Sequence, residues 1–179
     1  SSDAGIWKVT LGEIVIRKRE HVLAFRAIAN LLEGRLGTIL VPLCRAYQPI
    51  SADGSGYEAV PHSDGTFFSD GTGYVGTVIS VHTTSAAPAR AVSFTVSVDS
   101  RHDIEPGQHF SIGEGRLYRV RTFNEDTGEM TFRPPLREAV GNGTELNFDD
   151  PVCRMRLATD SEMDLELQMR RFGSPTVNF

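Results

Sequence analysis

The sequence predicts a mainly β fold, a β-sandwich or barrel-like domain with one amphipathic α-helix near its N-terminus. After residue 74, short apolar stretches alternate with Gly, Pro and Asn/Asp separators, at intervals of about 8–12 residues that are typical of sandwiches and barrels. One segment, residues 21–33, has the three-and-four spacing of a helix instead. Hydrophobic residues make up 40% of the 179 residues, which is enough for a core without metals or disulfides. We therefore expect one domain over 1–179, with a loop-rich insertion at about 48–74.

The N-terminal part predicts a strand followed by the helix. Apolar and polar residues alternate from Trp7 onward, which favours a strand that bends at Gly12. In residues 21–33 an apolar stripe lies opposite Arg26 and Asn30. The members of this stripe are Val22, Phe25, Ile28, Ala29 and Leu32.

A helix end, a buried strand and a turn-rich segment are expected next. Gly34 stands where a left-handed helix end belongs. Residues 38–41 form an apolar run that Pro42 ends, and they predict a strand buried on both faces. Residues 48–74 differ from the segments before them, since they contain several Asp-Gly dipeptides, which favour turns. These dipeptides begin at Asp53, Asp64 and Asp70. We expect a long loop or a set of tight hairpins here.

The rest of the chain predicts strands. Their expected ranges are 74–84, 91–98, 109–112, 117–123, 130–133, 145–148 and 152–157. Near the end, four apolar residues alternate with polar ones, and this period of two favours a strand although the composition suits a helix. The four are Met163, Leu165, Leu167 and Met169. Residues 175–179 are expected to be a tail or one more short strand.

Charge and composition exclude several classes of protein. The formal net charge of −5 argues against broad, sequence-independent nucleic-acid binding, which needs a basic face. No apolar run approaches the ~18 residues that span a bilayer, so we expect no membrane insertion. Cys44 and Cys153 are isolated and apolar in context, and we interpret them as buried hydrophobes. The N-terminal residues are polar and lack the charged and apolar regions of a signal peptide, so we expect synthesis in a cytoplasm. A chain that begins at Ser1 without a methionine is consistent with a trimmed fragment.

The search for chemistry yields no candidate catalytic, cofactor-binding or metal-ligating residue. The histidines lack metal-ligand spacing; they are His21, His62, His82, His102 and His109. The Asp-Gly turns offer oxygen atoms for calcium, but the closing Glu of a calcium loop is missing, and turn chemistry explains the same residues. Gly-x-Ser-x-Gly and phosphate-loop motifs are absent from the sequence. We expect no enzyme, and keep a hydrolase only as a minor alternative.

Three motifs form a distinctive constructional pattern across residues 6–158. The first is Trp7 in an opening strand before a helix that ends Leu32-Glu33-Gly34-Arg35. The second is a hairpin that reads Pro-Gly-x-x-Phe-Ser-Ile-Gly and then Leu-Tyr-x-Val, over residues 106–120. The third is a Pro-Pro-Leu-Arg turn at 134–137, followed by Asp-Pro at 150–151 and Met-Arg-Leu at 155–157.

In order and spacing, this pattern resembles the distal tail proteins of long-tailed bacteriophages and related gene-transfer particles. The resemblance implies a β-sandwich with one helix, of which six copies close into a ring between the tail tube protein and the tail-tip hub protein. It implies a structural component of the virion tail, assembled in the bacterial host cytoplasm, with no catalysis and with DNA only passing through the lumen. Free strand edges in a many-stranded domain also favour assembly, since edges need cover.

Two further expectations follow. If the ring surrounds a DNA path, acidic side chains should line it so that the polyanion does not stick; our candidates are Glu125, Asp126 and Glu129. Basic residues would then lie in subunit contacts or on outward faces, namely Arg35, Arg119, Arg133 and Arg137. The alternative function is a carbohydrate- or receptor-binding β-sandwich module, with the 48–74 loops as its binding face. Its stacking platforms would be Tyr57, Phe67, Phe68 and Tyr74.

Overall fold

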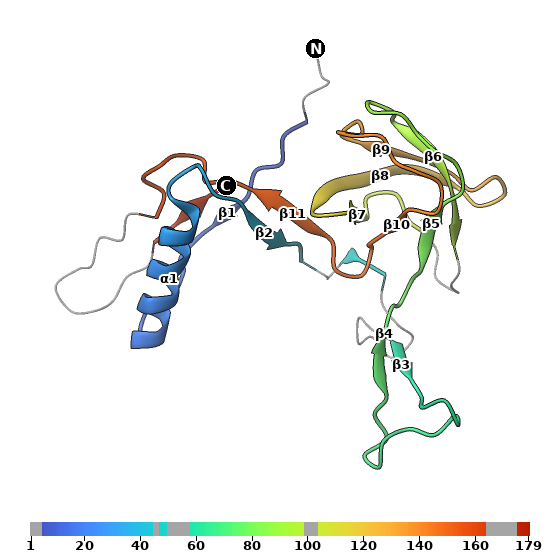
Figure 1. The fold of residues 1–179 in the computed structure, drawn as a ribbon, viewed down its shortest axis with the longest axis horizontal. Helices are drawn as coiled ribbons and strands as arrows, with labels where there is room; N and C mark the ends of the chain where they lie inside the picture. The colour runs from blue at the N-terminus through green and yellow to red at the C-terminus, as the bar shows by residue number, and fades with distance from the viewer. Residues whose placement is uncertain (1–4, 45–46, 50–57, 99–103, 164–174) are drawn as a thin grey trace. The chain divides into compact units, whose positions relative to one another are not determined.

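The structure is a computed structural model, which describes residues 5–44, 47–49, 58–98, 104–163 and 175–179 (Figure 1). The fold is mainly β with one helix over these residues, as the sequence predicts. The chain forms two compact units. Unit 1 contains 1–5 and 42–153, and unit 2 contains 6–41 and 154–179. The expectation of one domain stays a prediction, since compactness alone does not show which parts fold independently.

Unit 1 is built on a six-stranded antiparallel sheet with the order β10-β5-β6-β9-β8-β7 (Figure 1). Its strands are β5 (Val81–Thr83), β6 (Ser93–Val98), β7 (His109–Ile112), β8 (Arg116–Asn124), β9 (Glu129–Arg133) and β10 (Glu145–Leu146). The register of β8 against β9 shifts between Val120 and Thr122, and such an irregularity bends the strand. The sheet is nearly closed, like a barrel.

A cluster of aromatic side chains packs in the core of this nearly closed sheet. The ring of Phe110 stacks with those of Tyr118 and Phe148, with centroids 5.5 and 5.3 Å away, and meets Phe132 edge to face at 5.7 Å. All four residues are at most 1% exposed. Rings at such distances and angles gain stabilisation beyond their buried area. Phe110, Tyr118 and Phe132 come from β7, β8 and β9, and Phe148 follows β10.

Unit 2 packs the helix α1 (Arg19–Leu32) over a small sheet of β1 (Thr10–Leu11) and β12 (Val177–Asn178). Its buried core comprises Ile16, Phe25, Leu32, Leu157 and Val177. The helix was expected at 21–33, and its left-handed end begins at Glu33 (φ 45°) and continues at the predicted Gly34 (φ 64°). A side chain at Gly34 would also place Cβ 2.7 Å from an oxygen of the Asp160 side chain, which would have to shift, and the positive φ itself favours glycine.

Two shorter pairings complete the described strands. β2 (Ile39–Pro42) pairs with β11 (Val152–Met155). β3 (Glu58–Val60) pairs with β4 (Tyr74–Gly76) in an antiparallel hairpin. This hairpin lies within the turn-rich segment 48–74, as expected for tight hairpins; that the segment is an insertion stays a prediction.

Several expectations about individual elements are wrong. The strand expected at 74–84 is two strands, β4 and β5. Between these strands, Asp149 accepts hydrogen bonds from the backbone N–H groups of Val78 and Ile79 (3.1 and 3.3 Å), so these groups do not pair with a neighbouring strand. β2 is not buried on both faces, since Leu40 is 48% exposed. The first strand is only β1, and the chain bends at Glu13, one residue after Gly12.

Four other outcomes concern a residue of the helix, the two cysteines and two stretches near the C-terminus. Ile28 was assigned to the buried stripe of the helix, but it is 36% exposed. Cys44 was expected to be buried and is exposed, whereas Cys153 is buried as expected. The alternating residues Leu165, Leu167 and Met169 lie outside the described residues. The short strand considered for 175–179 is present as β12.

Candidate assembly surfaces

The six-stranded sheet has little free edge to offer a partner. Its outer strands β7 and β10 meet just beyond β10, where Ser111 and Asn147 each donate a backbone N–H to the other's carbonyl oxygen (2.9 Å both ways). Joining the two outer strands removes the unpaired groups that make an edge adhesive. The expectation that free strand edges favour assembly therefore does not hold for this sheet.

A second set of hydrogen bonds holds this seam between β7 and the segment after β10. The side chain of Gln48 makes these bonds, and we call them the clamp. Its side-chain amide donates to the carbonyl oxygens of His109 and Phe148 (2.6 Å each), and its oxygen accepts the His109 N–H (3.0 Å). Gln48 is 6% exposed, so these bonds satisfy a buried polar group and hold β7 to the segment after β10. No pattern in the sequence indicates this clamp, because a lone glutamine in a loop is not distinctive.

The helix α1 is apolar on two faces. One face packs in unit 2 through Val22, Phe25 and Leu32, and Ala29 is half-buried. A second, exposed face carries Leu23, Ala27 and Leu31 at spacings of four, with Ala24 and Ile28 beside them. Leu31 is 72% exposed and Leu23 is 46% exposed. A helix that is apolar on nearly all sides is normally buried, so this exposed apolar face lacks a cover among the described residues.

Basic side chains border the apolar outer face. Arg17, Lys18 and Arg19 stand at the start of α1, and Arg26 lies along it; all four are exposed. Glu20 is the acidic residue in the first turn. The excess of positive charge at this end of the helix would attract an acidic partner.

The hairpin β3–β4 ends in two copies of one turn. In the first, His62 N–H donates to Thr66 O and Gly65 N–H donates to His62 O (2.8 Å each). In the second, Phe68 N–H donates to Thr72 O and Gly71 N–H donates to Phe68 O, again at 2.8 Å. The shared sequence Ser-Asp-Gly-Thr, at 63–66 and 69–72, explains the repetition.

An aspartate closes each of these turns. Asp64 Oδ1 accepts the backbone N–H and the hydroxyl of Thr66 (3.0 and 2.7 Å), and Asp70 Oδ1 accepts the same two groups of Thr72 at the same distances. The threonine hydroxyl, and after it the N–H, holds the pKa of each aspartate below its ordinary value. Both turns are therefore negatively charged at neutral pH. Asp53, the third Asp-Gly aspartate, lies outside the described residues.

Exposed aromatic and aliphatic side chains cover this hairpin. The rings of His62, Phe68 and Tyr74 meet edge to face, with centroids 4.7–5.1 Å apart. The exposed fractions are 48% for Phe67, 40% for Phe68 and 52% for Tyr74, and Val75 reaches 76%. Such a concentration of exposed apolar residues marks a binding surface more often than isolated ones do. Tyr57, the fourth expected stacking platform, lies outside the described residues.

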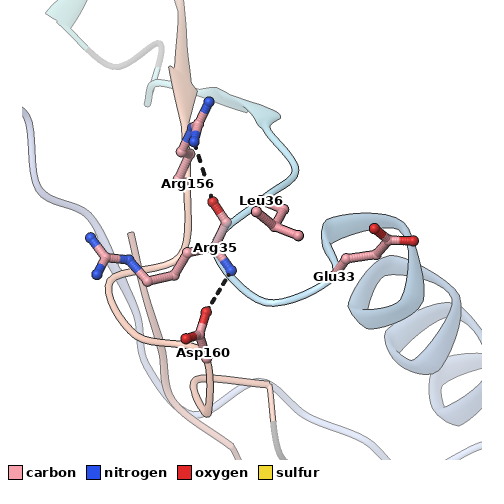
Figure 2. A pocket seen from close by; sticks show the side chains of 5 residues that line it. All are labelled: Glu33, Arg35, Leu36, Arg156 and Asp160. Atoms are coloured by element: carbon pink, nitrogen blue, oxygen red, sulfur yellow. Dashed lines mark hydrogen bonds between the residues drawn. The ribbon is translucent and has the colours of Figure 1, made fainter.

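An open depression of about 610 Å³ lies at the C-terminal end of α1, lined by Glu33, Arg35, Leu36, Arg156 and Asp160 (Figure 2). Asp160 Oδ1 accepts the backbone N–H of Arg35 (2.9 Å), and Arg156 donates to the carbonyl oxygen of Arg35 (3.5 Å). Figure 2 shows both bonds meeting at the backbone of Arg35, while its side chain extends away. The polar groups thus brace the helix end, and two acidic and two basic side chains balance in charge.

The residues expected along a DNA path lie at the turn between β8 and β9: Glu125 and Asp126 in the turn itself, and Glu129 as the first residue of β9. All three are exposed. Asn124 Oδ1 accepts the N–H groups of Asp126 and Thr127 (3.0 and 3.2 Å) and fixes the turn. The structure therefore presents these acidic side chains to solvent, as a lumen lining requires; that they line a lumen stays a prediction.

The four arginines expected in contacts or on outward faces are exposed. Arg119 and Arg133 face each other across β8 and β9. Arg137 donates to the carbonyl oxygen of Gly5 (2.6 Å). Arg35 borders the depression described above. Their part in subunit contacts stays a prediction.

Groups capable of chemistry are sparse in the described part of the chain. There, no group of three or more His, Cys, Asp or Glu side chains is placed to hold a metal ion. Burial, and then the charge of Arg119, lower the pKa of His109, and burial raises the pKa of the Cys153 thiol. Across the described ranges, no helix is long and apolar enough to cross a membrane.

Comparison with family models, with curated proteins and with solved structures finds no match to this chain. The functional interpretation therefore rests on the residues and their arrangement. The outer face of α1 and the β3–β4 hairpin are two surfaces on which several exposed apolar side chains gather among the described residues. Sequence reasoning missed the former, although Leu23 and Leu31 outside the first stripe were a signal for it.

Proposed function

We propose that this chain is a structural component of a phage-type tail tip, where copies of it form a ring, most simply a hexamer, between the tail tube protein and the tail-tip hub protein. DNA passes through the lumen of this ring, and the protein belongs to the virion tail. The observation that carries self-assembly is the exposed apolar face of α1, with Leu23, Ala27 and Leu31 in solvent. The order and spacing of the three sequence motifs carry the assignment to a tail.

The mainly β fold with one N-terminal helix supports the same proposal. A ring subunit needs a rigid body and surfaces that pair with a different surface on the next copy. The nearly closed sheet with its clamped seam supplies rigidity. The uncovered apolar surfaces lie outside this sheet, where contacts can form without opening it.

The direct test is the mass and shape of the purified protein. Native mass spectrometry and negative-stain imaging over a range of concentrations should give an annular oligomer. The ring should also bind the tail tube protein encoded beside it, since tail genes cluster. A protein that stays monomeric at every concentration, with or without that partner, would refute the proposal.

The charge of the lumen gives a second test in assembled particles. Glu125→Arg changes the charge by two per copy, hence by about twelve in a hexamer, and should slow DNA ejection because the basic lumen retains the polyanion. High salt should shrink this defect by screening. Asp150→Arg, at an exposed site outside the β8–β9 turn, is the control. Ejection at the normal rate by the Glu125 variant would show that this turn does not line the path.

A carbohydrate- or receptor-binding module remains the second candidate, favoured by the exposed Phe67, Phe68 and Tyr74. The edge-to-face packing of Phe68 and Tyr74 with His62 occupies part of the ring faces that a sugar would need. A glycan array distinguishes the two functions: binding that Tyr74→Ala abolishes, from a protein that stays monomeric, would favour this second function.

A further inference from the structure

We propose that the outer face of α1 in one copy binds the tip of the β3–β4 hairpin, residues 60–75, of a neighbouring copy. This inference rests on the proposed self-assembly and specifies which surfaces make the contact. It follows from two uncovered apolar surfaces that belong to different units of the chain.

The apolar parts of the two surfaces suit one another in kind. The helix presents Leu23 and Leu31 on either side of Ala27, so a small side chain lies between two larger ones. The hairpin presents large side chains, including Phe67 at 48% and Val75 at 76% exposure. Large side chains that pack over a small residue between larger ones can interdigitate with them.

The charges of the two surfaces are opposite. No Lys or Arg occurs between Arg45 and Arg90, and the turns of the hairpin carry the ionised Asp64 and Asp70. The N-terminal end of α1 carries Arg17, Lys18, Arg19 and Arg26, all exposed. Opposite potentials steer the two surfaces together and disfavour contacts between like surfaces, that is, hairpin with hairpin or helix with helix.

In the proposed ring, the contact between copies is heterologous, because the same two unlike surfaces meet at every step around it. Each copy then gives its hairpin to one neighbour and receives a hairpin from the other. If the rotation between copies closes, a ring results in which every outer face of α1 and every hairpin tip is covered. A two-fold contact between equal faces would instead leave one of the surfaces exposed in every copy.

The test uses two single substitutions at highly exposed positions, each introducing the charge that the opposing surface repels. Leu31→Glu alters the helix face, and Val75→Lys alters the hairpin. Each variant alone should lose the oligomer in native mass spectrometry, with at least a tenfold weaker dissociation constant. An equimolar mixture should form dimers and stop there, because only one intact helix face and one intact hairpin remain per pair. The controls are Leu36→Glu and Ile6→Lys, at positions that are 75% and 74% exposed; both should assemble like the original protein.

Other outcomes overturn the inference in distinguishable ways. If the original protein assembles and both variants assemble equally well, the contact lies elsewhere while the proposed function stands. If Val75→Lys alone forms a stable dimer that Leu31→Glu abolishes, helix pairs with helix. Cross-linking a mixture of ¹⁵N-labelled and unlabelled protein tests a contact within one chain. If every cross-linked pair of helix and hairpin peptides is either fully labelled or fully unlabelled, the hairpin covers the helix of its own chain. A monomeric original protein refutes the proposed function itself.

Discussion

The clamp formed by Gln48 gives the sharpest test of the fold of unit 1. Gln48→Glu changes one NH₂ group into an oxygen and leaves the shape of the side chain unchanged. The two carbonyl oxygens that the amide now meets at 2.6 Å, those of His109 and Phe148, would then face a carboxylate oxygen. Both hydrogen bonds would be lost and the buried acceptors left without their donor.

The magnitude follows from the number of groups affected. Each buried acceptor left unsatisfied costs about 1–3 kcal/mol, so two such acceptors predict a loss of about 2–6 kcal/mol in the free energy of unfolding at pH 7. A domain is typically stable by only about 5–15 kcal/mol. Gln48→Glu should therefore lower the urea midpoint strongly, and in the upper part of this range it should unfold unit 1.

The loss should depend on pH in a defined direction. The two carbonyl oxygens favour the protonated acid, which can donate one bond, so the pKa of Glu at position 48 should be higher in the folded state than its unfolded value of about 4.3. The defect relative to the original protein should then be smallest below about pH 4.3. It should grow as pH rises through the folded pKa, by up to about 1.4 kcal/mol per pH unit.

Urea unfolding followed by near-ultraviolet circular dichroism is the suitable assay, because the aromatic cluster of unit 1 supplies the signal. Fluorescence of Trp7, the only tryptophan, reports on unit 2. Gln108→Glu is the matched control: Gln108 is also 6% exposed, but its side-chain oxygen accepts a bond from Glu105 N–H (3.0 Å), which a carboxylate also does. Equal midpoints for Gln48→Glu and the original protein at both pH 4 and pH 7 would refute the clamp.

Three further outcomes are expected. Phe25→Ala should cost about 3–5 kcal/mol, since Phe25 is 7% exposed in the core of unit 2, whereas Ile28→Ala and Arg26→Ala should each cost about 0.5 kcal/mol or less by Trp7 fluorescence in urea; equal losses would mean that the packed face is misassigned. Replacing residues 61–73 with Asn-Gly should shift the melting temperature of unit 1 by less than about 3 °C, because Val60 and Tyr74 already face each other in register; cooperative loss of the fold would contradict this expectation. Calcium should not change the melting temperature of the original protein. The pKa of His109 is lowered in the folded protein, so its contribution to the free energy of unfolding is complete above about pH 6.5 and is lost as pH falls through the folded pKa. His109→Gln should therefore make the urea midpoint depend less on pH between pH 5 and 7. An unchanged dependence on pH would contradict the assignment.

The sequence predicted those elements whose pattern is local. The strand at 109–112 was predicted with its observed ends, and 91–98, 117–123 and 130–133 differ from β6, β8 and β9 by at most two residues at either end. In these strands, alternation of side chains follows directly from the pleat. The helix was found within two residues at each end for the same reason, since its periodicity is intrinsic to the segment.

What the sequence could not predict depends on contacts between distant residues. The gap between β4 and β5 arises because Asp149, far along the chain, captures two backbone N–H groups. The seam between Ser111 and Asn147 closes the sheet and removes the edges on which the argument for assembly had relied. Neither long-range pairing leaves a pattern within its own segment, so periodicity cannot reveal it.

Closure of the sheet decides where an interface can form. A subunit that paired through an open sheet edge would tie assembly to the hydrogen bonds of its core, and any mismatch between copies would strain the sheet. Here the seam is closed by Ser111 and Asn147 and clamped by Gln48. Two groups of exposed apolar side chains lie outside this sheet, on α1 and on the β3–β4 hairpin, and these residues contribute little to either core. Substitutions there should therefore change association while leaving folding intact, which is the separation of effects that the paired variants at Leu31 and Val75 are designed to measure.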